Sequence, residues 1–93
     1  MNFEWDIRKA ATNEAKHKVT FAEAIAVFQD SLSITYPDMD HSAEEDRFLI
    51  IGSTGAGKVL VVSHVFREEA IRIISARKAT ASERAFYEQQ SHH

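Results

Sequence analysis

The chain has 93 residues, of which 44% are hydrophobic and 27% charged, with one proline, three glycines and no cysteine. This length fits one small domain and excludes a two-domain enzyme. The absence of cysteine excludes disulfides, thiolate zinc sites and cysteine nucleophiles. We expect residues 1–90 to form the domain and residues 91–93 to be a polar tail that resembles a tag remnant.

The chain carries no signal-peptide pattern, and no apolar run approaches the roughly 20 residues of a membrane-spanning helix. We therefore expect a soluble, cytoplasmic protein. The net charge of −3 divides unevenly along the chain. Residues 1–46 contain four basic and ten acidic residues, a net charge of −6, whereas residues 47–93 contain seven and four, a net charge of +3. This asymmetry permits an anion-binding face on an acidic protein, although a solvated dipole would have the same composition.

The first part of the chain predicts two helices. A short apolar segment at Phe3 and Trp5 precedes Asp6, a suitable N-cap for a helix through about Lys16. The second helix, residues 21–29, is predicted from a capping box followed by apolar residues at helical spacing: Thr20 with Glu23, then Phe21, Ala24, Ile25 and Phe28.

The remainder of the chain predicts strands and a closing helix. Alternation over residues 32–36 indicates a strand that stops at Pro37, and an acidic loop follows over residues 38–46. Apolar, β-branched runs predict three more strands, at residues 48–51, 59–66 and 71–76. Thr80 with Glu83 forms a capping box for a helix to about Glu88. With the apolar start as a further strand, we expect an α+β fold in which two N-terminal helices and a C-terminal helix surround a mainly antiparallel sheet of four or five strands.

The last two strands predict a hairpin with a definite register. If residues 67–70 connect them, four pairs share one face: Leu60 with Arg77, Val62 with Ser75, His64 with Ile73, and Phe66 with Ile71. Arg72 and Lys78 would then point to the other face. Trp5, Phe28 and Phe66 are expected in the core.

The glycine-rich segment of residues 52–58 matches the first seven positions of a phosphate-binding P-loop, G-x-x-x-x-G-K. The next residue is Val59 instead of Ser or Thr, so magnesium would lack its hydroxyl ligand. The residues that follow have a strand pattern, whereas a P-loop leads into a helix. We therefore interpret the segment as a hairpin loop whose glycines adopt positive φ angles.

Histidine, carboxylates and arginine remain for chemistry. His64 on an apolar strand is more often a hydrogen-bonded core residue than a catalyst, and His17 fits a solvated helix end. His41 lies in the acidic loop, where carboxylates could raise its pKa for acid–base work, but the loop lacks the ligand pattern of a calcium site and we expect no metal. Arg77 and Lys78, just before a helix, could meet a phosphate or form surface ion pairs.

Several short motifs together resemble the BrnT toxin family. The resemblance runs from residue 3 to about residue 88 and rests on Phe3-Glu4-Trp5-Asp6, Lys16-His17, Asp40-His41-Ser42, Glu45-Asp46-Arg47, and above all residues 72–80 with Glu83-Arg84 and Tyr87. Two positions depart from the family pattern: Lys18 stands where glycine is frequent, and Asp46 replaces a usual glutamate.

This resemblance implies the toxin of a bacterial type II toxin–antitoxin module with a RelE-like ribonuclease fold. Such a protein would cleave RNA without a metal or other cofactor, inhibit translation and growth, and be neutralised by its antitoxin. The implied partner is a BrnA-like ribbon-helix-helix antitoxin in a 2:2 heterotetramer. The toxin would contact operator DNA only through this antitoxin. A chain that serves chiefly as co-repressor, with little nuclease activity, remains the alternative.

The implied reaction is attack of a ribose 2′-hydroxyl on the adjacent phosphate, which needs a base, an acid and fixed positive charge. We expect Arg67 and Arg77 to hold the scissile phosphate, because arginine stays charged and binds phosphate through a fork of donors. Proton transfer would come from His41, Glu45 or Tyr87. The further candidates for RNA and phosphate binding are Arg47, Arg72, Lys78 and Arg84.

Overall fold

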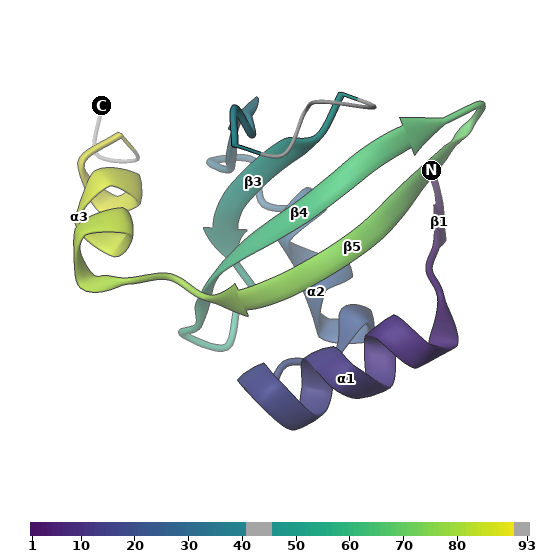
Figure 1. Cartoon of the computed structure of the whole chain (residues 1–93). Coiled ribbons are helices and arrows are strands. Elements are labelled where there is room, and N and C mark those ends of the chain that lie inside the picture. The colour runs from purple at the N-terminus through teal and green to yellow at the C-terminus, as the bar shows by residue number, and fades with distance from the viewer. Residues whose placement is uncertain (41–45, 91–93) are drawn as a thin grey trace.

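The computed structural model describes residues 1–40 and 46–90, which form three helices and one five-stranded sheet (Figure 1). The strand order is β1-β5-β4-β3-β2; β1 runs parallel to β5 and all other neighbours are antiparallel. The predicted α+β fold is confirmed. The elements in chain order are β1 (Asn2–Glu4), α1 (Ile7–His17), α2 (Phe21–Phe28), β2 (Ile34–Pro37), β3 (Phe48–Ser53), β4 (Val59–Arg67), β5 (Ala70–Lys78) and α3 (Ala81–Gln90).

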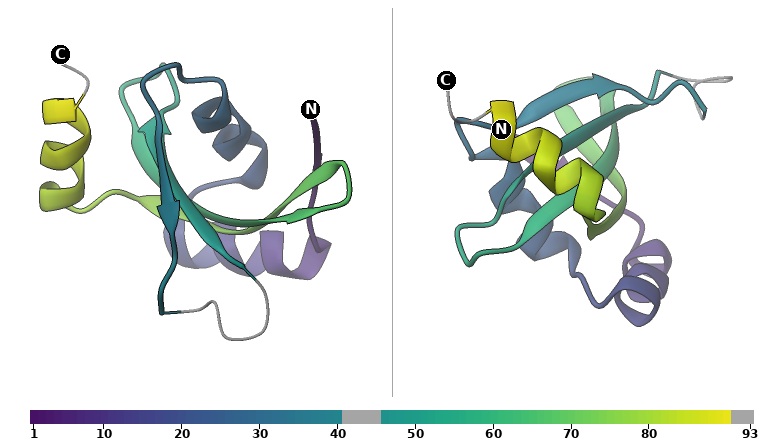
Figure 2. Two further views of the ribbon diagram at one scale, coloured as in Figure 1. Left: turned by 90° about the horizontal axis from the view of Figure 1, so that it is seen from above. Right: turned by 90° about the vertical axis from the view of Figure 1, so that its left-hand side faces the viewer.

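The helices divide unequally between the two faces of the sheet. Helix α1 packs on β5 and α2 packs across β3, β4 and β5, so both cover the same face. Helix α3 contacts β3 and stands at one end of the sheet (Figure 2). On the opposite face, α3 is the only helix among the described residues, and its Tyr87 shares a buried cluster with Ile51, Val59 and Val61. We call this second face the open face.

The three helices begin where their capping residues predict. The Asp6 side chain accepts hydrogen bonds from the backbone N–H groups of Arg8 and Lys9, and Thr20 and Glu23 form the predicted capping box. Helix α1 is followed by its C-cap residue Lys18, which adopts the left-handed conformation (φ 59°) that favours glycine at a helix C-terminus. Within the described residues, no helix combines the length and apolar character needed to cross a membrane.

The β4–β5 hairpin contains a bulge that the predicted register lacks. His64 lies opposite Ile73 and Phe66 opposite Ile71, as predicted. Beyond Ser63 the register shifts because Ile74 is an extra residue without a partner on β4. Leu60 therefore lies opposite Lys78 and Val62 opposite Ala76, so the predicted pairs Leu60–Arg77 and Val62–Ser75 are wrong. The predicted face of Lys78 is wrong for the same reason, because Lys78 shares the face of Leu60.

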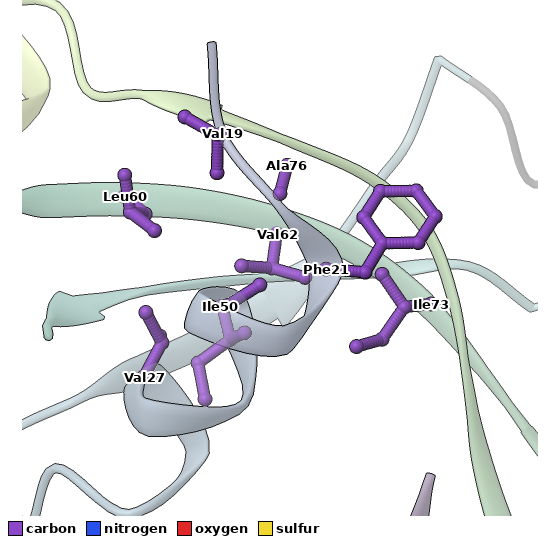
Figure 3. Close-up of a cluster of buried hydrophobic side chains, with 9 residues drawn as sticks. Val19, Phe21, Val27, Ile50, Leu60, Val62, Ile73 and Ala76 are labelled. Carbon is purple, nitrogen blue, oxygen red and sulfur yellow. The ribbon is translucent and has the colours of Figure 1, made fainter. Parts of the chain in front are cut away.

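The main hydrophobic core lies between α2 and the sheet (Figure 3). Phe28 and Trp5 pack against this core as expected, but Phe66 is 60% exposed, so its predicted burial is wrong. Phe66 lies next to the β4–β5 turn, where its ring contacts those of Phe48 and His64. The last residue of α2, Phe28, contacts His64, two residues before Phe66 on β4. The buried members of the core are Val19, Phe21, Ala24, Val27, Ile50, Leu60, Val62, Ile73 and Ala76.

The glycine-rich segment connects β3 to β4 as a hairpin, which confirms its interpretation as a turn. Gly55 and Gly57 have φ angles of +86° and +84°, as expected. Gly52 is different, because it belongs to strand β3 and is buried. A Cβ atom there would lie 3.1 Å from Oδ2 of Asp30 and 3.0 Å from the Val27 side chain, so glycine allows α2 and its C-terminal turn to approach β3 closely.

Asn13 joins α1 to the edge of β5. Its side-chain amide donates to the carbonyl groups of Val19 and Ala76, at 3.0 and 2.8 Å, and its Oδ1 accepts from the Ala76 N–H at 3.0 Å. Strand β1 covers this edge of β5 only at Ala70–Arg72. The Asn13 amide therefore supplies hydrogen bonds that a neighbouring strand would otherwise provide.

We expect Asn13→Ala to lower the free energy of unfolding by about 2–4 kcal/mol, because it leaves three buried backbone groups without partners. Urea denaturation followed by circular dichroism measures this loss. Glu14→Ala, at an exposed position of the same helix, should change the value by less than about 0.5 kcal/mol. Equal losses of stability in the two variants would contradict this role of the Asn13 side chain.

Candidate functional site

The open face carries a cleft of about 400 Å³ between β3, β4, β5 and the segments that flank residues 41–45. Its lining combines arginines, carboxylates and hydroxyl groups on an apolar floor, a composition suited to a polar, charged ligand. The lining residues are Asp38, Asp40, Arg47, Leu49, Ser63, Ile74, Ser75 and Arg77.

Strand alternation and the bulge explain which side chains reach this cleft. Ser63 lies opposite Leu49 on one side and Ser75 on the other, so the three side chains share a face. Two residues farther along β5, Arg77 lies on that face as well, opposite Val61. The bulge at Ile74 places Arg77 on this face, since regular pairing of Ile74 with Ser63 would put Arg77 opposite buried Leu60.

The guanidinium of Arg77 is held by Glu83 on α3. Its two terminal nitrogens donate to the two carboxylate oxygens at 2.7 and 2.9 Å. Oε1 of Glu83 also accepts from the backbone N–H of Thr80, which completes the predicted capping box of α3. The hydrogen bonds from Arg77 lower the pKa of Glu83 to about 2, so the carboxylate stays ionised and the arginine stays oriented.

This pairing leaves part of the Arg77 fork available. Arginine has five N–H donors. The contacts with Glu83 and a weaker one to the Lys78 carbonyl, at 3.3 Å, use only some of them, and Nε bonds to no other described residue. The side chain is 37% exposed, so an anion in the cleft can reach the remaining donors.

Two groups near Arg77, one aromatic and one acidic, are absent from the candidates that the sequence predicts. Burial, together with the charge of Glu83, raises the pKa of Tyr36, which keeps its phenol protonated. Asp38 is only 8% exposed, and its backbone N–H donates to the Arg47 carbonyl at 2.9 Å. Period-2 alternation predicts the face that Tyr36 occupies, but only strand pairing places β2 beside β3 and so brings Tyr36 to the open face.

Tyr87 occupies a different environment from the cleft. It is 7% exposed, and its hydroxyl donates to Oδ2 of Asp30 at 2.5 Å. Burial and this carboxylate raise the pKa of Tyr87 to about 12. Burial also acts to raise the pKa of Asp30, but hydrogen bonds from the Ser53 and Leu32 N–H groups and from Tyr87 outweigh it and lower the value. Tyr87 thus anchors α3 to the sheet and to the turn after α2.

The other predicted phosphate-binding arginines and lysine are dispersed. Arg67 is the last residue of β4, at the hairpin turn. It lies six residues along β4 from Val61, the residue opposite Arg77, which corresponds to roughly 20 Å between these two positions of β4. The structure therefore does not bring Arg67 and Arg77 together. Arg72 bonds to Glu4 of β1 at 2.7 Å, and Arg84 bonds to Glu88 on the surface of α3 at 2.9 Å. Lys78 is exposed on the face opposite Arg77.

The histidines have separate roles. His64 is 1% exposed, its Nδ1 lies 3.2 Å from the Val62 carbonyl, and burial lowers its pKa, as befits a neutral core residue. His41 and Glu45 lie outside the described residues, between Asp40 and Asp46 in the chain. Among the described residues, no group of three or more histidine or carboxylate side chains is arranged to hold a metal ion.

Comparison with known proteins relates this architecture to one family. A comparison with curated proteins gave no match. The crystal structure of the Brucella abortus ribonuclease toxin BrnT superposes with a TM-score of 0.70 and 29% sequence identity, covering 86% of this chain and 97% of the Brucella chain. Residues 5–83 match the family model described as the ribonuclease toxin BrnT of type II toxin–antitoxin systems. The chain therefore belongs to the BrnT family of ribonuclease toxins.

Proposed function

We propose that this toxin cleaves RNA in the cleft of the open face, with Arg77 and Arg47 holding the scissile phosphate. The observation that carries the proposal is the convergence of these two arginines with the Ser63 and Ser75 side chains on one side of the sheet. Membership of a ribonuclease toxin family supplies the reaction class. The arginines then provide the fixed positive charge that a phosphorane needs.

The reaction that fits this site is attack of the ribose 2′-hydroxyl on the adjacent phosphorus. The 2′-oxygen loses its proton to a base, forms the new P–O bond, and the 5′-oxygen leaves with a proton from an acid, giving a 2′,3′-cyclic phosphate. Because Arg77 and Arg47 can balance the added negative charge, we propose that no metal ion takes part. Retained cleavage of RNA in EDTA tests this point, and loss of cleavage that added magnesium restores would contradict it.

We propose that His41 and Glu45 supply proton transfer. They are separated from Asp40 and Arg47, two residues that line the cleft, by no more than one residue in the chain. Tyr87 suits this role less well, since its hydroxyl is buried and already donates to Asp30. Arg67, Arg72, Lys78 and Arg84 lie away from the cleft lining, so any contact they make with RNA would be with flanking nucleotides.

A type II toxin has an antitoxin partner, and we propose that this one is a BrnA-like ribbon-helix-helix protein that forms a 2:2 heterotetramer and blocks cleavage. The cleft is open to solvent on the face that α1 and α2 do not cover, so a partner chain could cover it. Expression of the chain alone should arrest bacterial growth, and co-expression of the adjacent antitoxin reading frame should restore it. Normal growth with the chain alone would contradict the toxin activity.

The alternative function, a co-repressor with little nuclease activity, is favoured by one observation. Glu83 occupies both terminal nitrogens of Arg77, which reduces the charge available to a phosphate. An isolated chain that leaves RNA intact but strengthens operator binding by the antitoxin would support this function over cleavage.

We expect Arg77→Ala to lower the rate of RNA cleavage by about 10²–10³-fold, because it removes a fixed charge that stabilises the transition state. Single-turnover cleavage of a labelled RNA measures the rate. Arg8→Ala, which removes an exposed cation on α1, should leave the rate within about twofold of wild type.

The Glu83→Gln variant distinguishes the effect of phosphate binding by Arg77 from the effect of its ion pair with Glu83 of α3. This variant weakens the ion pair but keeps the guanidinium, so it should cleave RNA at least about tenfold faster than Arg77→Ala. If both variants lost cleavage equally while remaining folded, the ion pair and not the phosphate contact would explain the effect of Arg77.

Glu83 also predicts a pH dependence of stability. Its pKa falls from an ordinary 4.5 to about 2 on folding, so the ion pair stabilises the fold above about pH 4.5, and this contribution disappears as the pH falls toward 2. The difference in unfolding free energy between wild type and Glu83→Gln should be about 1–2 kcal/mol at pH 6, allowing for solvent screening. Urea denaturation at several pH values should show the difference shrinking between pH 4.5 and 2; a constant difference would contradict the assignment.

A further inference from the structure

A second, smaller hollow lies on the other side of the β5 edge from the cleft. It has a volume of about 210 Å³ and is formed by one side of α1 and by the bulged part of β5. Its lining contains two lysines and a histidine but no carboxylate. The lining residues are Lys9, Thr12, Asn13, Lys16, His17, Ile74 and Ser75, and we call this hollow the α1 groove.

The lysines of the α1 groove have no acidic partner in the part of the chain that the structure describes. Among residues 1–40 and 46–90, neither Lys9 nor Lys16 forms an ion pair. Glu14, the acidic residue of α1, lines a different hollow together with Ala11, Ala15 and Lys18. Lys9 and Lys16 are seven residues apart, which places them on one side of the helix and about 10 Å apart along its axis. The groove therefore presents two exposed cations that form no ion pair with the described residues.

The α1 groove and the cleft share two residues. Ile74 and Ser75, at the bulge of β5, line both. Strand β1 pairs with β5 only as far as Arg72, so at the bulge no described strand extends the sheet beyond β5. A ligand chain can therefore pass over this edge of the sheet, from Arg77 and Arg47 in the cleft to the lysines of α1.

We propose that the α1 groove binds the phosphates of the RNA strand that flank the cleavage site, so that the toxin holds a single-stranded segment longer than the cleaved dinucleotide. This inference rests on the proposed function of the cleft. A path that turns over a sheet edge suits a flexible single strand, whereas a duplex is stiff over tens of base pairs. Lysines that bind the backbone supply affinity without base preference.

The salt dependence of RNA binding tests the proposal on the intact chain. The probe is a fluorescein-labelled single-stranded RNA of about ten nucleotides, with 2′-O-methyl groups that prevent cleavage, and anisotropy gives the Kd at several salt concentrations. For a single strand, removing one lysine that binds a phosphate reduces the slope of log Kd against log salt by about 0.7. The double variant Lys9→Ala/Lys16→Ala should therefore lower the slope by about 1.4 and weaken binding at low salt.

The matched control is Arg8→Ala/Lys18→Gly, which removes two positive charges from α1 and its C-cap outside the groove lining. Glycine suits the left-handed conformation of residue 18, so the control should fold. Its salt slope should stay within about 0.5 of wild type. Circular dichroism checks that both double variants keep the wild-type content of helix.

Measurements of RNA cleavage distinguish a failure of the proposed RNA binding by the α1 groove from a failure of the proposed cleavage in the cleft. A dinucleotide that reaches only the cleft should be cleaved by Lys9→Ala/Lys16→Ala at the wild-type rate, and a ten-nucleotide RNA more slowly than by wild type at low concentration. If the slope is unchanged in a toxin that cleaves RNA, RNA binding by the α1 groove is contradicted, whereas cleavage in the cleft is not. An unchanged slope with weakened antitoxin binding would assign the groove to the antitoxin and equally overturn the proposal. Intact RNA with wild-type toxin would instead overturn the function of the cleft.

Discussion

The bulge in β5 determines which side of the sheet Arg77 occupies. If Ile74 paired regularly with Ser63, a hairpin with the same turn would place Arg77 opposite Leu60, which is fully buried in the core beneath α2. An unpaired guanidinium in that position would lose its hydration without compensation. After the bulge, each residue of β5 lies on the face opposite to the one that regular alternation would give it. Ala76 therefore enters the core and Arg77 reaches the open face.

The same strand segment connects the core, the first helix and the last helix. Ala76 contributes its side chain to the core and its backbone groups to Asn13 of α1. Its neighbour Arg77 pairs with Glu83, which also caps the start of α3. One short stretch of β5 therefore orients both helices and the cleft, which explains why a domain with so small a core can hold an arginine in a fixed geometry.

Local sequence signals predicted most of the elements but not their mutual arrangement. The capping residues Asp6 and Thr20 and the alternating strands are short-range patterns, and they placed helices and strands within a few residues of where they occur. The bulge has no comparable signal, because Ile73 and Ile74 both suit a strand and either could face the core. Burial of Phe66 was wrongly predicted because the type of residue does not reveal how far α2 extends over β4.

The sequence by itself determined the class of fold, the family and the presence of many candidate cations, since these follow from periodicity and from short motifs along the chain. Only the tertiary structure decided which cations lie close together. It separated Arg67 from Arg77 by the length of a hairpin, combined Arg77 with Arg47, and brought lysines of α1 to the opposite side of the same strand edge. The physical reason is that pairing register and helix packing connect residues distant in the chain, and one extra residue in a strand reverses every face that follows it.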